Sequence, residues 1–294
     1  MANIETPIPL LKLNDGNTIP MLGYGTGTAW YTSNESVDRK TVEAIKTAIK
    51  LGYSHIDAAE VYKTEADVGV AIKESKVARE KLFVTTKVNQ SVDDIPKAID
   101  QSLKKLQLDY VDLFLIHQPF FAKSDEDLQK AWTAMERVKA SGKARSIGVS
   151  NYLIPHLEAT LKVASSPPSI NQIEFHPYLQ HGPLLDYHKQ HNIATAAYGP
   201  LTAVTKAKPG PVDTLLAELA KKYYVSESEI SMRWCVDSGV AAITTSSSEQ
   251  RLSDYLRSMT FSLTPREIED LSSKGQEKHF RGFWTKNFAA DDRS

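Results

Sequence analysis

The chain has 294 residues, of which 41% are hydrophobic and 24% are charged, a composition that allows a large globular core. Lysine and arginine number 35 against 36 for aspartate and glutamate, so the net charge is -1, and no basic field is available to recruit nucleic acid or an anionic membrane. The single cysteine, Cys235, excludes an intramolecular disulfide and a cysteine-based metal cluster.

Cys235 lies in an apolar helical pattern, which favours a core thiol over a nucleophile. The eight histidines are scattered, so we expect no metal site. Residues 1–12 hold no apolar stretch of signal-peptide length, and the longest apolar runs are too short to span a bilayer. The expected location is the cytoplasm, with no membrane partner. The sequence indicates no oligomeric state.

The chain begins with a predicted hairpin, because Asn14-Asp15-Gly16-Asn17 separates two short apolar runs. Residues 21–28 then form a strand that enters a glycine-rich turn around Gly23, Gly25 and Gly27. A dinucleotide fingerprint would need a helix to begin there, whereas residues 29–36 are typical of a loop. A Rossmann phosphate site is therefore disfavoured.

Helices and strands alternate from residue 39 onward. Apolar spacing and end signals predict helices over 39–51, 65–74, 95–106, 125–141, 153–163, 183–191, 212–223, 227–237, 249–257 and 265–273. Strands are predicted over 54–57, 82–87, 111–116, 144–149, 169–174, 193–198 and 240–244. With the strand that begins at Met21, this makes eight βα units and no dividing linker.

Eight such units predict an α/β fold, a (β/α)₈ TIM barrel in one domain over residues 1–294. The N-terminal hairpin would plug the barrel floor, and extra helices would lie near the C-terminus. Residues 275–294 would form a tail beside the substrate. An open doubly wound sheet is the alternative, but it would usually carry its phosphate fingerprint in the first βα turn.

Proton-active residues follow four consecutive strands. Asp57 ends the second strand, Tyr62 lies just beyond it, Lys87 ends the third and His117 follows the fourth. Since the carboxyl ends of barrel strands share one mouth, we expect these side chains to meet there. Each residue alone has an ordinary explanation, such as a helix cap or a solvated lysine. Four such residues at the ends of neighbouring strands favour a functional site.

These groups suit the transfer of a proton to a developing alkoxide. The ammonium of Lys87 would lower the pKa of Tyr62, Asp57 would keep Lys87 charged, and His117 would bind the substrate oxygen. This is carbonyl reduction, and it requires a hydride donor because no side chain supplies one. The alternative, a Schiff base on Lys87, would need a neutral amine, which Asp57 disfavours.

Seven motifs resemble those of the aldo-keto reductase family, and the resemblance covers nearly the whole chain. The motifs are 23–28 (GYGTGT), 55–62 (HIDAAEVY), 85–87 (TTK), 109–117 (DYVDLFLIH), 148–151 (GVSN), 171–177 (NQIEFHP) and 198–201 (YGPL). The resemblance implies a TIM-barrel oxidoreductase with a catalytic tetrad of Asp57, Tyr62, Lys87 and His117, in which Tyr62 is the proton donor.

The resemblance also implies a nicotinamide cofactor that lies extended across the barrel mouth. Ser150, Asn151 and Gln172 match positions that hold its carboxamide, and Tyr198 matches the ring that stacks on the nicotinamide. The full set of implied cofactor contacts is Gly25, Thr26, Asp57, Ser150, Asn151, Gln172, Tyr198, Gly199, Leu201, Thr244, Thr245, Ser246, Arg251 and Asp254.

One departure concerns the cofactor's 2′-phosphate. Where the family commonly has Ile-Pro-Lys-Ser, this chain has Ile243-Thr244-Thr245-Ser246 and so lacks the lysine. Arg251 stands in the matching place for an arginine, and the hydroxyls of Thr245 and Ser246 can bond a phosphate. The implied cofactor is NADPH, with NADH as the alternative. Asp254 and Tyr255 replace the usual Glu-Asn pair near the adenine.

The Thr-Thr-Ser-Ser variant and His117-Gln118-Pro119-Phe120-Phe121 resemble the fungal reductases of conjugated polyketones and ketopantoyl lactone. The expected substrate contacts are Trp30, Tyr62, His117, Phe120, Phe121, Phe283 and Trp284, although the tail aromatics could equally be packing. No basic cluster beyond Arg281 offers an obvious clamp for a carboxylated substrate, so a neutral aldehyde, α-dicarbonyl or ketolactone is the expected substrate. The competing hypothesis is a catalytically weak, nucleotide-binding barrel that acts as a regulatory or interaction subunit.

Overall fold

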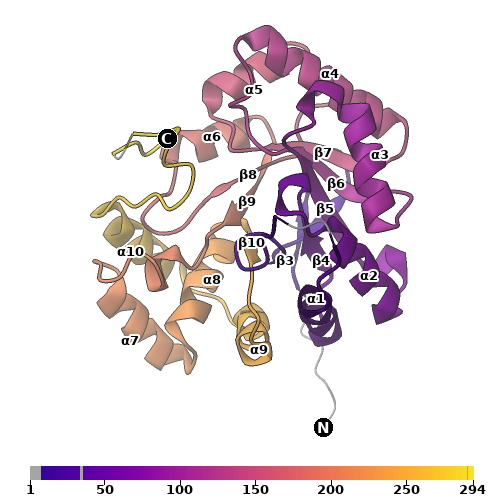
Figure 1. Ribbon diagram of the computed structural model, residues 1–294. Helices are drawn as coiled ribbons and strands as arrows, with labels where there is room; N and C mark the ends of the chain where they lie inside the picture. The colour runs from indigo at the N-terminus through magenta and orange to yellow at the C-terminus, as the bar shows by residue number, and fades with distance from the viewer. Residues whose placement is uncertain (1–7, 34–35, 290) are drawn as a thin grey trace.

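The computed structural model describes residues 8–33, 36–289 and 291–294. Parts of the predicted 1–294 domain and of the 29–36 loop lie outside this range. Eight parallel strands close into a barrel, and Figure 1 looks along its axis. The ring order is β10-β3-β4-β5-β6-β7-β8-β9, which confirms the predicted (β/α)₈ architecture and excludes the open sheet. The strands are β3 (Leu22–Gly25), β4 (His55–Asp57), β5 (Phe83–Val88), β6 (Val111–Ile116), β7 (Ala144–Ser150), β8 (Ile170–Glu174), β9 (Ala194–Tyr198) and β10 (Ala241–Thr244).

Helices surround the strands on the outside (Figure 1). They are α1 (Arg39–Leu51), α2 (Glu65–Ser75), α3 (Ile95–Leu106), α4 (Asp125–Ala140), α5 (Ile154–Leu161), α6 (Gly182–Gln190), α7 (Asp213–Tyr223), α8 (Glu227–Asp237), α9 (Glu249–Arg257) and α10 (Pro265–Gln276). α7 and α8 both lie between β9 and β10, as predicted. α10 continues to Gln276, so the C-terminal tail begins at residue 277 rather than 275. Among the described residues, no helix combines the length and hydropathy needed to cross a bilayer.

Local chemistry explains where these helices begin and end. The side chain of Asp38 accepts a hydrogen bond from the N–H of Lys40 at the start of α1. Gly52 ends the same helix with a left-handed φ of 113°. At α8, Ser226 and Glu229 form a reciprocal capping box. These signals are local, which is why the sequence predicts most helices to within a few residues.

Side chains along each strand alternate between the helices and the barrel interior. On β4, Ile56 faces the helices and belongs to the large outer core. The lower part of the interior is a separate apolar cluster, which we call the floor: Leu13, Ile19, Phe83, Leu113, Leu115, Ile170, Ala196 and Ala241. Two of its members, Leu13 and Ile19, come from the hairpin of β1 (Leu10–Lys12) and β2 (Thr18–Pro20). The hairpin therefore plugs the floor, as predicted.

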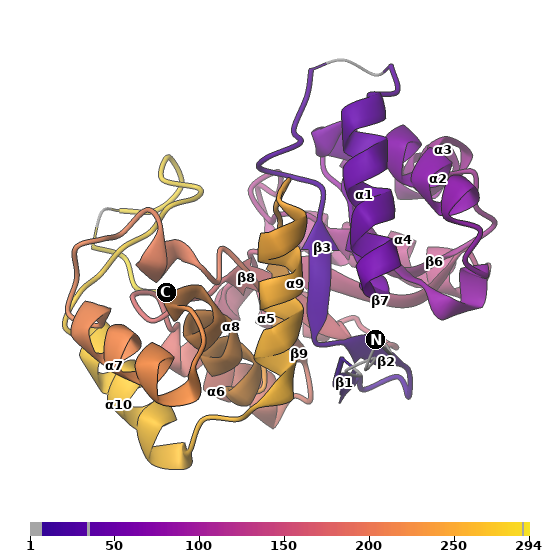
Figure 2. The same ribbon diagram turned by 90° about the horizontal axis from the view of Figure 1, so that it is seen from below.

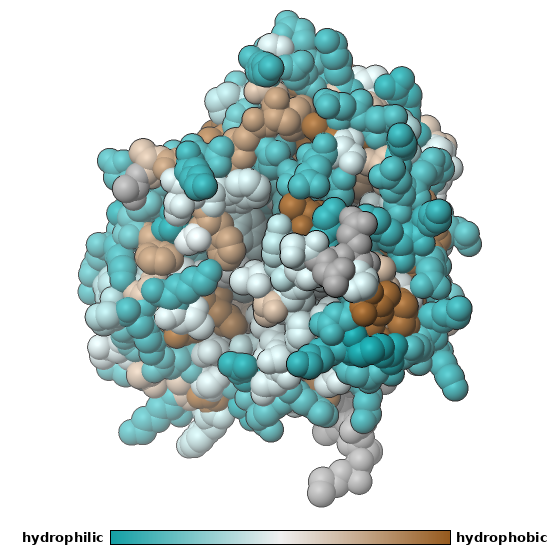
Figure 3. Space-filling view, in the orientation of Figure 1, coloured by the Kyte–Doolittle hydropathy of each residue, from teal (hydrophilic) through white to brown (hydrophobic). Residues whose placement is uncertain are grey.

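The opposite end of the barrel, which we call the mouth, receives the carboxyl ends of the strands. In Figure 2 the β1–β2 hairpin lies at one end of β3, and the loop that follows β3 lies at the other. Figure 3 shows the mouth face, where hydrophilic residues form most of the rim and more hydrophobic residues gather toward the middle. Residues at the strand ends are therefore brought together there whatever their separation in sequence.

Candidate active site

Four proton-active side chains meet at the mouth. Asp57 ends β4, Lys87 lies near the end of β5, and His117 directly follows β6. Lys87 is fully buried, and Asp57 and His117 are 2% and 6% exposed. Tyr62 ends a short 3₁₀ helix, Glu60–Tyr62, where an irregular loop is predicted. The structure thus brings the predicted tetrad into one place.

Lys87 is held as a cation by its neighbours. Its Nζ donates to Asp57 Oδ1 at 2.5 Å and to the carbonyl of Ala58 at 2.9 Å. Burial opposes the charge, but the carboxylate of Asp57 and the phenol of Tyr62 outweigh it and raise the pKa of Lys87. A charged Lys87 is not a nucleophile, so this arrangement argues against the Schiff-base alternative.

The phenol of Tyr62 faces both Lys87 and His117. Its oxygen lies 3.5 Å from His117 Nε2, and the two rings meet edge to face at 5.4 Å. Lys87 Nζ lies 5.0 Å from the centre of the Tyr62 ring. A Cβ on Gly27 would come within 3.0 Å of that ring, so the glycine-rich turn leaves the space that Tyr62 fills. The 3.5 Å gap is one that a substrate oxygen could close.

The pKa of Tyr62 departs from the expectation. Burial raises it above the ordinary value of 10, and the charge of Lys87 opposes this only in part. The predicted lowering is therefore wrong for this state of the molecule, because desolvation of the phenolate outweighs its attraction to the ammonium. Burial, aided by Lys87, also holds the pKa of His117 well below its usual range, so its imidazole is neutral.

A chain of hydrogen bonds joins the tetrad to the residues that the family resemblance assigns to the carboxamide of the cofactor. Gln172 Nε2 donates to Asp57 Oδ2 at 2.8 Å, and Ser150 Oγ donates to the carbonyl of Gln172 at 2.7 Å. Asn151 Nδ2 bonds Ser150 Oγ at 3.0 Å, and Asn151 Oδ1 accepts from the Tyr198 hydroxyl at 2.5 Å. Asn151 takes a left-handed φ of 62°, which asparagine tolerates better than most residues.

The residues that the resemblance assigns to the 2′-phosphate of the cofactor lie close together between the end of β10 and the start of α9. Arg251 Nε donates to Ser246 Oγ at 3.1 Å, and Ser246 Oγ also accepts from the N–H of Ser248 at 3.0 Å. The hydroxyl of Thr245 is buried and makes no hydrogen bond of ordinary geometry, although it lies near enough to the Tyr24 phenol to oppose in part the rise that burial causes in the pKa of Tyr24. A buried hydroxyl without such a bond is costly unless a ligand completes it. A helix N-terminus after the last barrel strand is a frequent phosphate site in this fold.

Other predicted cofactor residues have structural partners. Thr26 is fully buried, and its hydroxyl bonds the carbonyl of Asp57 at 3.1 Å and the hydroxyl of Thr64 at 2.8 Å. Asp254 accepts from Gln250 on the exposed side of α9. The remaining predicted contacts border the same mouth at the ends of β3, β9 and β10: Gly25, Gly199, Leu201 and Thr244.

The aromatic residues predicted to contact the substrate divide into two groups. Trp284 of the tail lies beside His117 and Phe120, with ring centres 6.1 Å and 5.3 Å apart respectively. Phe121 and Trp30 instead pack, half-buried, against the outer core. Trp284 therefore contacts the tetrad at His117, and Phe120 contacts Trp284, whereas Phe121 and Trp30 pack against the outer core.

Two carboxylates at the mouth are absent from the predicted site. Glu174 is the last residue of β8 and has a fully buried side chain. Its period-two spacing from Gln172 could have indicated that it faces inward. Glu60 precedes Tyr62 by two residues, and its Oε2 accepts from the N–H groups of Asn89 and Gln90 at 2.8 and 2.9 Å. No local motif predicts that contact.

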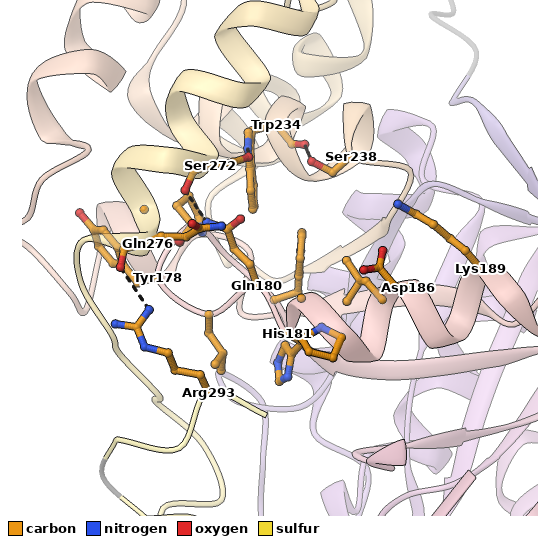
Figure 4. Close-up of a pocket in the computed structure, with 17 residues that line it drawn as sticks. Tyr178, Gln180, His181, Asp186, Lys189, Trp234, Ser238, Ser272, Gln276 and Arg293 are labelled. Carbon is orange, nitrogen blue, oxygen red and sulfur yellow. Dashed lines mark hydrogen bonds between the residues drawn. The ribbon is translucent and has the colours of Figure 1, made fainter. Parts of the chain in front are cut away.

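A cavity of about 660 Å³ lies outside the barrel, between α6, α8, α10 and the tail (Figure 4). Trp234 of α8 and Ser272 of α10 line one side, while Lys189 of α6 and Arg293 of the tail lie at opposite ends. None of its lining residues belongs to the tetrad. The chemistry described above is therefore separate from this cavity.

Comparison with known proteins gives one consistent result. The model of the Aldo/keto reductase family matches residues 21–276. An NAD/NADP-dependent indole-3-acetaldehyde reductase of Schizosaccharomyces pombe is 40% identical over 91% of this chain and 96% of its own length. An NADPH-dependent alpha-keto amide reductase of Saccharomyces cerevisiae is 39% identical over 95% of this chain and 96% of its own length.

A solved structure agrees with the sequence relatives. The aldo-keto reductase of Bombyx mori, in complex with NADP, superposes with a TM-score of 0.81 at 37% identity, over 90% of this chain and 92% of that one. The matched segment contains the strand ends that carry Asp57, Lys87 and His117. The chain belongs to the aldo/keto reductase family of oxidoreductases.

Proposed function

We propose that this protein reduces neutral aldehydes and ketones to alcohols with NADPH, and that Tyr62 is the proton donor. The observation that carries the proposal is the contact between a charged Lys87, a protonated Tyr62 and a neutral His117 at the mouth. The fungal relatives support the reaction class, since their names describe reductases of an aldehyde and of alpha-keto amides.

The residues present fit an NADPH molecule. The buried hydroxyl of Thr245 and the guanidinium of Arg251 offer a donor and a charge for its 2′-phosphate, which NADH lacks. At the other end, Ser150, Asn151 and Gln172 would hold the carboxamide, and Tyr198 would support the nicotinamide ring. The cofactor supplies a hydride when bound.

Each tetrad residue has a separate task. Tyr62 donates its proton to the oxygen of the carbonyl that is being reduced, and it stays protonated until then because burial raises its pKa. Lys87 stabilises the phenolate that remains, and Asp57 orients Lys87 through the 2.5 Å bond. Neutral His117 donates from Nε2 to the same oxygen.

The mouth suits a neutral substrate. Arg281, the basic group considered as a carboxylate clamp, donates from its Nη2 to the main-chain oxygens of Asp292 and Ser294, at 3.3 and 2.5 Å. Its guanidinium also lies 3.9 Å from the ring centre of Phe288. Phe120 and Trp284 provide apolar surface beside the tetrad. Small α-dicarbonyls and ketolactones are therefore the proposed substrate class.

The test is an assay of the purified protein with NADPH and a panel of α-dicarbonyls and ketolactones, followed at the nicotinamide absorbance band. The proposal predicts loss of absorbance that depends on protein concentration. NADPH binding without turnover of any member of the panel would overturn it. That result would instead support the regulatory, nucleotide-binding barrel.

A further inference from the structure

The further inference concerns Glu174, the last inward-facing residue of β8. Ile170 belongs to the floor, Gln172 reaches across the barrel to Asp57, and Glu174 continues the same row by the period of two. In the strand register it pairs with Tyr198 of β9. Its carboxylate therefore lies at the mouth beside the proposed nicotinamide platform.

The carboxylate is fully buried, so it requires compensating donors. Oε1 accepts from His176 Nε2 at 3.1 Å and from the N–H of Gly282 at 2.7 Å. Oε2 accepts from the N–H of Phe283 at 3.1 Å. His176 is fixed as a donor at Nε2, because its Nδ1 accepts from the N–H of Tyr178. Two of the three donors thus belong to the tail, more than 100 residues away.

Phe283, which is part of this attachment, and Trp284, which follows it, contact the site directly. Phe283 meets Tyr198 edge to face, with ring centres 5.1 Å apart. Trp284 lies beside His117. Trp284 has a left-handed φ of 55°, a conformation that bulky residues rarely adopt and that persists only where surrounding contacts impose it. The attachment to Glu174 supplies such a contact immediately before it.

The far end of the tail is also attached to the barrel exterior. Arg293 Nη1 donates to the carbonyl of Gln276 at 3.1 Å, beside the cavity of Figure 4. Between its two attached ends, the tail carries the aromatic groups that face the site. At the mouth, the hydrogen bonds to Glu174 hold the backbone of residues 282 and 283, and ring contacts with Tyr198, His117 and Phe120 then orient Phe283 and Trp284.

We propose that Glu174 is a positioning residue that fastens residues 282–284 over the mouth and thereby forms the wall against which the apolar part of a carbonyl substrate packs. This inference rests on the proposed reductase function. Glu174 does not touch the reacting carbonyl, so its effect depends on substrate size. A substrate with an aryl group uses the wall, whereas methylglyoxal does not reach it.

The test variant is Glu174→Gln, which keeps the shape of the side chain. The amide has a single acceptor oxygen, so at least one of the three bonds is lost and an NH₂ group faces a donor. We expect amide exchange in residues 280–289 to become about tenfold faster, since a hydrogen bond to a charged group is lost. For an aryl α-diketone KM should rise about tenfold, with kcat and the KM for methylglyoxal within about twofold.

Glu229→Gln is the matched control. Glu229 is also fully buried and accepts from a backbone N–H, that of Ser226, but it lies on α8. The Glu229→Gln variant should lower thermal stability and leave unchanged the amide exchange of residues 280–289 and the KM values for both substrates. In a chain that ends at Arg281, Glu174→Gln should have no further effect on KM, because two changes that act through one segment are not additive.

Unchanged exchange in residues 280–289 of Glu174→Gln would overturn the proposal. An equal loss of kcat for both substrates would also overturn it, because Glu174 would then act on the reacting centre. Tail exchange needs no turnover, so it still tests the attachment if no carbonyl is reduced. Failure of the reductase function and failure of this inference are thereby distinguished.

Discussion

The two ends of the barrel are built from the same strands but from opposite chemistry. β5 places Phe83 in the floor and Lys87 at the mouth, four residues later on the same inward face. β6 places Leu113 in the floor, and His117 follows its mouth end. The floor is apolar and closed by the hairpin, whereas the mouth holds buried charge. Along one strand, the inward-facing side chains thus change from apolar packing residues to proton-active residues within four residues of chain.

Replacement of Lys87 by methionine should have the largest effect on this contrast, because it makes one mouth position resemble the floor. We expect turnover to fall about 100- to 10,000-fold, since the phenolate of Tyr62 loses its cation. Stability should also fall, by roughly 3–5 kcal/mol, because Asp57 is left buried and unpaired. Steady-state kinetics and denaturant unfolding measure the two effects.

The double variant Asp57→Asn with Lys87→Met separates the two losses. It removes both charges, so it should recover most of the stability while turnover stays low. Recovery of turnover together with stability would mean that the charged pair at the mouth is structural only.

Leu113→Ala tests the floor. Leu113 is 1% exposed, and its truncation should cost about 2–5 kcal/mol of unfolding free energy, because a cavity remains in a packed cluster. Values of kcat and KM for the folded fraction should stay within about twofold. Leu10→Ala is the control, since Leu10 is 62% exposed and should change stability by less than about 0.5 kcal/mol. A large kinetic effect of Leu113→Ala would contradict the separation of floor and mouth.

Buried histidines predict a smaller, graded dependence of stability on pH. Burial lowers the pKa of His55 to about 4, so the folded state keeps it neutral while the unfolded state binds a proton below about 6.5. Stability should therefore fall as pH falls through this window, by about 2 kcal/mol between pH 6.5 and about pH 5 from His55 alone. His188, with a pKa lowered to about 3, acts in the same direction. Thermal unfolding across this range measures the slope, which His55→Asn should reduce; an unchanged slope would contradict the assignment.

The sequence could predict the barrel and the strand-end positions because both follow from local periodicity and one topological rule. Asp57, Lys87 and His117 each end or follow a strand, so their meeting required no knowledge of side-chain packing. Closure of the floor by the hairpin was likewise confirmed, since Leu13 and Ile19 of the hairpin belong to the floor.

Long-range packing could not be predicted. The direction of the Tyr62 pKa depends on how fully the mouth is desolvated, which no local pattern records. The attachment of residues 282 and 283 to Glu174 joins segments more than 100 residues apart. Phe121 follows Phe120 in sequence, yet it packs against the outer core while Phe120 faces Trp284.

The central claim is that Tyr62 donates the proton, and a pair of hydroxyl deletions tests it most directly. Tyr62→Phe removes a buried hydroxyl at the mouth. Tyr53→Phe removes one just before the start of β4, where the Tyr53 hydroxyl donates to the carbonyl of Leu252 at 3.0 Å. We predict that Tyr62→Phe binds NADPH with unchanged affinity and reduces carbonyls at least about 100-fold more slowly, while Tyr53→Phe keeps its turnover. Normal turnover by a folded Tyr62→Phe protein would contradict the claim.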